Sequence, residues 1–161
     1  MEEIRGSRAL HRLADNLEAA VGLVNEARRE VCLLSPALDP LLYGRAEFLS
    51  AVREFLLGST RARLRVLVHD GQVPMRHGHP LVPLLRRFSS QAECRRVASD
   101  LRERADSVLL VDGRTLVQRP DAAGYEGHVD TDPQRARTEQ AQFDEIWNHS
   151  EPDRELRRLY L

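Results

Sequence analysis

The segment spanning residues 107–118 constrains the fold of this chain more than any other. Two apolar runs, 107–111 and 114–118, stand on either side of the dipeptide Asp112-Gly113. An Asp-Gly pair between two such runs is typical of a two-residue β-turn, because both central positions of that turn need a positive φ angle. We therefore predict an antiparallel hairpin whose register this turn sets.

Helical and strand patterns alternate along the rest of the chain. In the first predicted helix, Leu10, Leu13 and Leu17 recur at the spacing of one helix face. The predicted helices cover 8–29, 44–57, 80–88, 134–148 and one or two turns of 153–161; the strands before the hairpin cover 30–34, 63–68 and 93–98; the loops cover 35–43 and 119–133. Alternating β and α elements predict one α/β domain over 1–161, with a mainly parallel mixed sheet flanked by helices and a terminal hairpin.

Composition and charge exclude several classes of protein. With 161 residues, of which 42% are apolar, the chain can build the core of one domain. Its net charge of -1 gives no overall field that would attract nucleic acid or an anionic membrane. All 24 basic residues are arginine, which rules out lysine-based catalysis.

The first residues and the cysteines point to one compartment. Residues 1–5 form no apolar run like that of a signal peptide, and no stretch approaches the roughly 18 apolar residues of a membrane span. Cys32 and Cys94 stand in apolar stretches without a C-x-x-C spacing, so we predict two buried thiols. We therefore expect a cytoplasmic protein with no membrane insertion.

The hairpin and the elements around it resemble the phospholipase D-like family. In that family a signature H-x-K-x-x-x-x-D runs up the first strand of a hairpin into its turn. Asp112 stands at the signature's Asp, whereas Ala105 and Ser107 occupy its His and Lys positions. Three further segments follow the family's order: the strands 30–34 and 63–68 and the pair Phe143-x-x-x-Trp147. The resemblance implies a bacterial, single-half member of that family with a degenerate signature.

The resemblance also implies which chemistry is missing. In the family, the signature His is the nucleophile that forms a phospho-histidine, and the signature Lys holds the phosphate. Ala105 and Ser107 supply neither the imidazole nor the fixed cation that this chemistry needs. The family's G-S-x-N segment is replaced by Arg119-Pro120-Asp121-Ala122. We therefore expect no catalytic residue and no cofactor, but a binding or interaction module. Because single-half members often pair, the resemblance implies a homodimer or a partner protein.

Polar residues follow both of the first two predicted strands. Ser35 comes after 30–34, and His69-Asp70 come after 63–68. Ligands of α/β proteins bind at the carboxyl ends of such strands. We expect a retained ligand cleft to suit a small anion and to gather Ser35, His69, Asp70, Asp112, Arg114 and Arg119. Asp112 has a second interpretation, as no more than the first residue of the Asp-Gly turn.

A histidine cluster leaves one alternative open. His69, His77 and His79 lie close in the sequence and could ligate zinc together with Asp70. The chain would then be a metal-assisted phosphoesterase. A polar loop before a helix explains the same residues without a metal.

Arginine pairs leave a second alternative open. Arg86-Arg87 and Arg95-Arg96 could form a weak nucleic-acid-binding patch. Acidic residues stand among them, and aromatic residues for base stacking make up only 5% of the chain. We therefore expect no nucleic-acid partner.

Overall fold

The computed structural model of the chain describes residues 6–69, 78–101 and 104–152. The described helices are α1 (Leu13–Glu26), α2 (Pro40–Tyr43), α3 (Ala46–Gly58), α5 (Leu81–Arg87) and α6 (Pro133–Asn148). The described strands are β1 (Ser7–Leu10), β2 (Glu30–Leu34), β3 (Arg63–Val68), β4 (Ala92–Arg96), β5 (Ser107–Val111), β6 (Thr115–Arg119), β7 (Gly127–Asp130) and β8 (Glu151–Pro152). None of these helices is long and apolar enough to span a membrane.

The strands form one sheet in the order β1-β7-β6-β5-β2-β3-β4-β8. The central strands β2, β3 and β4 are parallel, and the other neighbouring pairs are antiparallel. The predicted α/β class and mixed sheet are confirmed. Parallel pairing is confined to β2, β3 and β4, so the sheet is less parallel than predicted.

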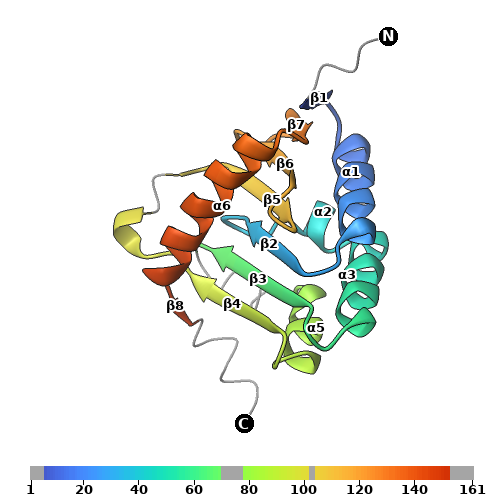
Figure 1. Ribbon diagram of the computed structural model, residues 1–161, viewed down its shortest axis with the longest axis vertical. Helices are drawn as coiled ribbons and strands as arrows, with labels where there is room; N and C mark the ends of the chain where they lie inside the picture. The colour runs from blue at the N-terminus through green and yellow to red at the C-terminus, as the bar shows by residue number, and fades with distance from the viewer. Residues whose placement is uncertain (1–5, 70–77, 102–103, 153–161) are drawn as a thin grey trace.

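Two apolar layers cover the two faces of the sheet. On one face, α1, α2, α3 and α5 pack on sheet residues such as Val31 and Leu33. On the other face, α6 packs on Cys32 and Leu34 through Phe143, Ile146 and Trp147. Figure 1 shows α6 crossing its face alone, with the other helices on the opposite side. Because β2 is covered on both faces, its residues form the continuous apolar run seen in the sequence.

The predicted hairpin is confirmed as β5 and β6. Val111 pairs with Thr115, and the two residues that reverse the chain, Asp112 and Gly113, have φ angles of 55° and 62°. Positive φ at both positions is the turn geometry that matches the twist of the flanking strands. The predicted two-residue turn would pair Val111 with Arg114; the observed register leaves Arg114 in the connection as well, so β6 begins one residue later than predicted.

The predictions miss the elements that depend on distant pairing. Residues 7–10 form strand β1 rather than helix, because they pair antiparallel with β7 at the sheet edge. β7 itself lies in the predicted loop 119–133, and α2 lies in the predicted loop 35–43. In α2, the Asp39 carboxylate accepts a hydrogen bond from the Leu41 N–H and so caps the helix. The predicted turns over 153–161 lie outside the described residues.

Candidate functional site

Asp112 has a structural role at the amino end of β2. Its carboxylate accepts hydrogen bonds from the backbone N–H groups of Arg28 at 2.9 Å, Arg29 at 2.8 Å and Glu30 at 2.9 Å. Burial raises the pKa of this carboxyl group, but the hydrogen bonds outweigh it, so the net pKa lies below the usual value. One carboxylate thus fastens the β5–β6 turn to the connection between α1 and β2.

The five described residues of the predicted cleft lie at the two opposite ends of the parallel strands. Asp112 and Arg114 are at the amino ends of β2 and β3, whereas Ser35 and His69 follow their carboxyl ends. Five strand residues at about 3.3 Å each separate the two edges by about 16 Å. Arg119 lies at the carboxyl-end edge, and Asp70 is outside the described residues. The prediction of one shared cleft is wrong for these residues. Because β5 runs antiparallel to β2, the β5–β6 turn lies at the amino ends of the parallel strands.

Ser107, at the signature's Lys position, is enclosed by other residues near the carboxyl ends of the parallel strands. Its side chain is buried, and its hydroxyl lies 2.8 Å from the hydroxyl of Tyr43 in α2. Burial raises the pKa of Tyr43, which keeps this phenol protonated. Ala105, at the signature's His position, is exposed and accepts a hydrogen bond from the Ala122 N–H through its carbonyl.

Arg119 fills the space beside Ser107. The two residues face each other across β5 and β6, and the Arg119 side chain is only 1% exposed. Its Nη1 donates to the carbonyls of Ala122 at 3.2 Å and Gly124 at 2.9 Å, while its Nη2 has no hydrogen-bond partner among the described residues. Its guanidinium carbon lies 5.9 Å from the centre of the Tyr43 ring. The guanidinium of Arg119 therefore places a positive charge beside the signature's Lys position, and carbonyl groups of the same chain bind it.

Asp39 and Tyr125 complete what we call the Arg119 cluster: Asp39, Tyr43, Ser107, Arg119 and Tyr125. The Tyr125 hydroxyl donates to the Asp39 carboxylate at 3.0 Å, and Arg119 Nη1 lies 3.5 Å from the same oxygen. The Tyr125 ring centre is 5.3 Å from the guanidinium carbon of Arg119. Sequence reasoning missed Asp39, Tyr43 and Tyr125, because all three stand in segments without a periodic pattern.

The histidine cluster is only partly described. His79 is buried, and its Nδ1 accepts a hydrogen bond from the Leu81 N–H at 3.0 Å. Burial lowers the pKa of His79, although nearby Asp39 opposes this shift. The described residues contain no group of three or more His, Cys, Asp or Glu side chains placed to hold a metal ion. His77 and Asp70 lie outside those residues, so the zinc alternative stays a prediction.

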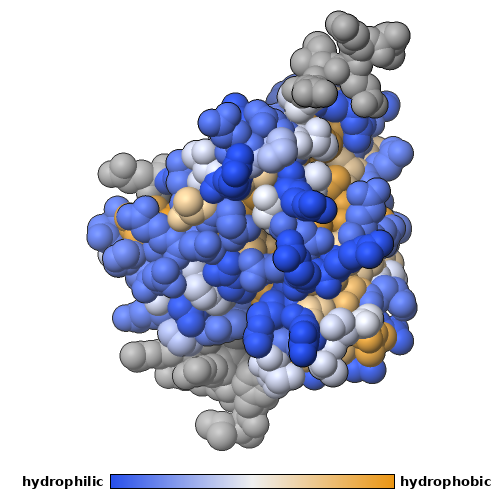
Figure 2. All heavy atoms as spheres, in the orientation of Figure 1, coloured by the Kyte–Doolittle hydropathy of each residue, from blue (hydrophilic) through white to orange (hydrophobic). Residues whose placement is uncertain are grey.

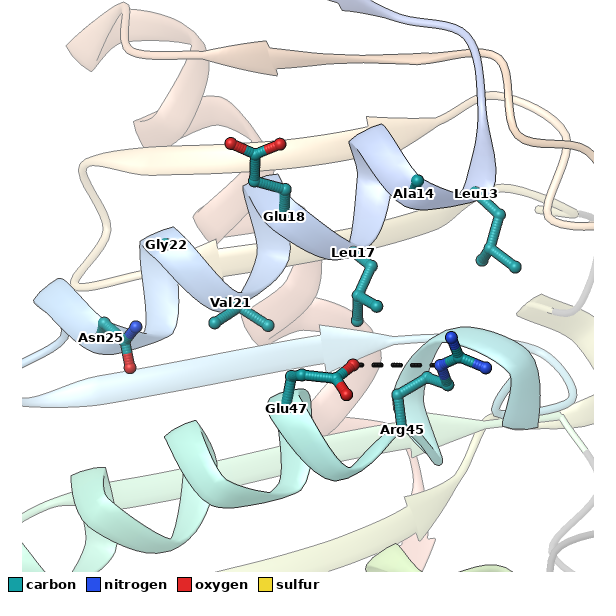
Figure 3. Close-up of a pocket in the computed structure, with 9 residues that line it drawn as sticks. All are labelled: Leu13, Ala14, Leu17, Glu18, Val21, Gly22, Asn25, Arg45 and Glu47. Atoms are coloured by element: carbon teal, nitrogen blue, oxygen red, sulfur yellow. Dashed lines mark ion pairs between the residues drawn. The ribbon is translucent and has the colours of Figure 1, made fainter.

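A separate hollow of about 500 Å³ lies between α1 and α3. Figure 3 shows Leu17 and Val21 pointing from α1 toward α3, where Arg45 and Glu47 form an ion pair at 3.9 Å. Its size is that of a ligand pocket, and its surface is mostly apolar. Its polar lining residues are Glu18, Asn25, Arg45 and Glu47.

Comparisons with known proteins bear on this geometry. Residues 12–159 match the family described as "Domain of unknown function (DUF7931)". No curated protein matches the chain.

Solved structures show the same fold at low sequence identity. TrmBL2, an archaeal chromatin protein whose structure is described as showing a novel mode of DNA binding, has a TM-score of 0.65 and 13% identity; the match covers 94% of this chain and 55% of that one. Nuc, a phospholipase D family member from Salmonella typhimurium, has a TM-score of 0.61 and 10% identity, covering 91% of this chain and 96% of that one. NucT from Helicobacter pylori has a TM-score of 0.63 and 9% identity, covering 91% and 98%. The chain therefore has a phospholipase D-like fold.

Proposed function

The chain belongs to the family described as "Domain of unknown function (DUF7931)", and we propose that it is a non-catalytic, phospholipase D-like module that acts by binding. The proposal includes a homodimer as the working form, as the resemblance implies. It also places the module in a bacterial cytoplasm, where a reducing environment preserves buried thiols such as Cys32 and Cys94.

The closed pair of Ser107 and Tyr43 is the observation that carries this proposal. Where the family's signature has a phosphate-holding Lys, a buried hydroxyl is already engaged by a phenol at 2.8 Å. Arg119 beside it is paired with Asp39 and two carbonyl groups. A group held in this way cannot attack phosphorus, and a neutralised cation adds little stabilisation to a developing phosphorane charge.

The similarity to TrmBL2 is compatible with binding in place of hydrolysis. That protein is described as a chromatin protein that binds DNA, and its fold matches 94% of this chain. At 13% identity the likeness concerns the fold only, so the partner of this chain must be argued from its own surface.

Hydrolysis of bis-p-nitrophenyl phosphate tests the proposal. The purified full chain is assayed without metal and with added zinc or manganese, beside the variants His79→Asn and His149→Asn. His149 is the matched control, because it is exposed at the end of α6, which packs on the opposite face of the sheet from α5. We expect no hydrolysis above the buffer rate in any sample.

Two results would overturn this proposal. Hydrolysis without added metal that persists through further purification would show that the fold has kept a catalytic site. Metal-dependent hydrolysis that His79→Asn abolishes and His149→Asn keeps would favour the metal-assisted phosphoesterase. Sedimentation equilibrium tests the homodimer, for which we expect twice the chain mass of 18.4 kDa.

A further inference from the structure

Five exposed arginines gather at the amino-end edge of the parallel strands, opposite the Arg119 cluster. We call them the arginine edge: Arg28, Arg29, Arg61, Arg63 and Arg114. The Arg63 N–H donates to the Arg29 carbonyl at 3.0 Å, which places the starts of β2 and β3 side by side. Asp112 binds the backbone of Arg28 and Arg29 and so brings Arg114, two residues further on, to the same edge. In Figure 2, strongly hydrophilic side chains at this end of the sheet lie among patches of apolar ones.

Nearby carboxylates leave the arginine edge with an excess of positive charge. Asp112 is engaged by three backbone N–H groups, and Glu30 pairs with Arg65 at 2.8 Å. Glu26 and Glu54 are the exposed carboxylates on the adjoining ends of α1 and α3. None of the ion pairs among the described residues involves an arginine of this edge. Asp112 keeps its negative charge while it accepts these hydrogen bonds, so five guanidinium groups stand against three carboxylates: Asp112, Glu26 and Glu54.

The spacing of this edge suits a row of phosphates. Neighbouring strands lie about 4.8 Å apart, so the β5–β6 turn and the starts of β2 and β3 span about 10 Å. Each strand of duplex DNA rises about 3.4 Å per phosphate along the axis, so this length corresponds to about three phosphates. The planar guanidinium fork matches phosphate oxygens in pairs. A small hollow of about 330 Å³ beside Arg28 is lined by the polar residues Asn25 and Ser59 and also by the carboxylate of Glu54.

We infer that the arginine edge binds the phosphate backbone of duplex DNA without regard to sequence. The inference rests on the proposed function, because it names the partner of the binding module. The segments 26–30, 59–63 and 112–115 contain no aromatic residue that could stack on a base. Leu57 is the large apolar side chain exposed on the adjoining helix, too little apolar surface to anchor a membrane. The expectation of no nucleic-acid partner rested on the net charge, on acidic residues beside the arginine pairs 86–87 and 95–96, and on the few aromatic residues; none of these describes the local charge of the arginine edge.

Fluorescence anisotropy with a short, labelled duplex of mixed sequence tests this inference. For three to five phosphate contacts, the logarithm of the affinity should fall against the logarithm of salt with a slope of about -3 to -4.5. A fourfold rise in salt would then weaken binding about 60- to 500-fold. The double variant Arg29→Gln/Arg63→Gln should lower the slope by about two, since it removes two contacts.

The matched control removes the same charge from the opposite edge. Arg45 precedes α3 and Arg96 ends β4, and both are exposed there. Arg45→Gln/Arg96→Gln should leave the slope unchanged, and thermal unfolding should show that both double variants are folded.

Three outcomes would overturn the inference: no binding to the duplex at low salt, equal weakening in both double variants, or binding to phosphatidylserine vesicles but not to the duplex. Each leaves the proposed absence of catalysis intact. Phosphodiester hydrolysis would instead overturn the proposed function and leave the duplex affinity as measured, so the two failures are distinguishable.

Discussion

At the scale of single residues, Asp112 shows how one side chain can join two segments of backbone that lie far apart in the chain. Its carboxylate binds the N–H groups of Arg28, Arg29 and Glu30, while its own backbone takes the φ angle of 55° that the turn needs. Asn tolerates the same backbone conformation, so Asp112→Asn changes the acceptor without straining the turn.

We predict that Asp112→Asn lowers the free energy of unfolding by about 1–2 kcal/mol at neutral pH, because a charged acceptor of several hydrogen bonds is lost. The pKa of Asp112 is lower in the folded chain than in the unfolded one. Its contribution is therefore complete above the unfolded value of about 3.9 and disappears as pH falls through the folded value.

Urea unfolding from pH 7 down to pH 3 measures this effect. The difference in the free energy of unfolding between Asp112→Asn and the natural chain should become smaller below about pH 4. Glu145→Gln, a change of the same kind on the exposed face of α6, should leave stability unchanged at every pH. A constant gap across the whole range would contradict the role of the charge.

Arg119 is the second residue whose surroundings decide how much it contributes to the stability of the fold. We predict that Arg119→Met costs about 3 kcal/mol, because it removes the ion-pair partner of Asp39 and the donor to two part-buried carbonyls. Arg114→Met makes the same chemical change at an exposed position and should cost at most about 0.5 kcal/mol. Equal unfolding midpoints in guanidinium chloride would refute the assignment of Arg119 to a closed cluster.

At the scale of elements, α6 is tied to the sheet by Arg65 of β3. Its guanidinium carbon lies 5.1 Å from the centre of the Phe143 ring and 5.4 Å from that of Trp147. The same group pairs with Asp144 at 2.7 Å. The Phe143-x-x-x-Trp147 spacing puts both rings on one helix face, so the pair serves to dock the only helix on this face of the described sheet.

Two glycines in different elements should respond in opposite ways to alanine. In α1, a Cβ on Gly22 would meet nothing within 4 Å, so Gly22→Ala should stabilise the chain by about 0.5–1 kcal/mol. In β7, a Cβ on Gly127 would lie 2.6 Å from the Gln118 carbonyl oxygen, so Gly127→Ala should destabilise it by about 1–3 kcal/mol. Thermal unfolding of the two variants measures both shifts, and a loss of stability in Gly22→Ala would contradict the first.

At the scale of the whole molecule, the sheet order predicts which part unfolds last. β2, β3 and β5 are central and covered on both faces, whereas β1 and β8 are the outer strands. We expect amide hydrogens of the three central strands to exchange with solvent at the rate of global unfolding, and those of β1 and β8 much earlier. Hydrogen exchange followed by mass spectrometry checks this, and early exchange in β2 would contradict it.

Some features could be predicted from the sequence because they depend on neighbours in the chain. The Asp112-Gly113 turn and the β2 and β3 runs are such features, and the predicted bounds of β2 and β3 agree with the structure. The Arg119 cluster could not be predicted, since Tyr43 and Ser107 meet across 64 residues of chain. β1 was missed for the same reason, because residues 7–10 form a strand only where β7 lies beside them.

The sequence by itself determined the alternation of elements, the hairpin and the replacement of the signature His and Lys by Ala105 and Ser107. The tertiary structure alone decided at which edge each polar residue lies. The physical reason is strand direction: β5 pairs antiparallel with β2, which sends Asp112 to Arg28 and Arg29 and leaves Ser107 near Ser35. Periodicity carries no information on pairing partners, so neither the closed Arg119 cluster nor the arginine edge can be seen before the sheet is assembled.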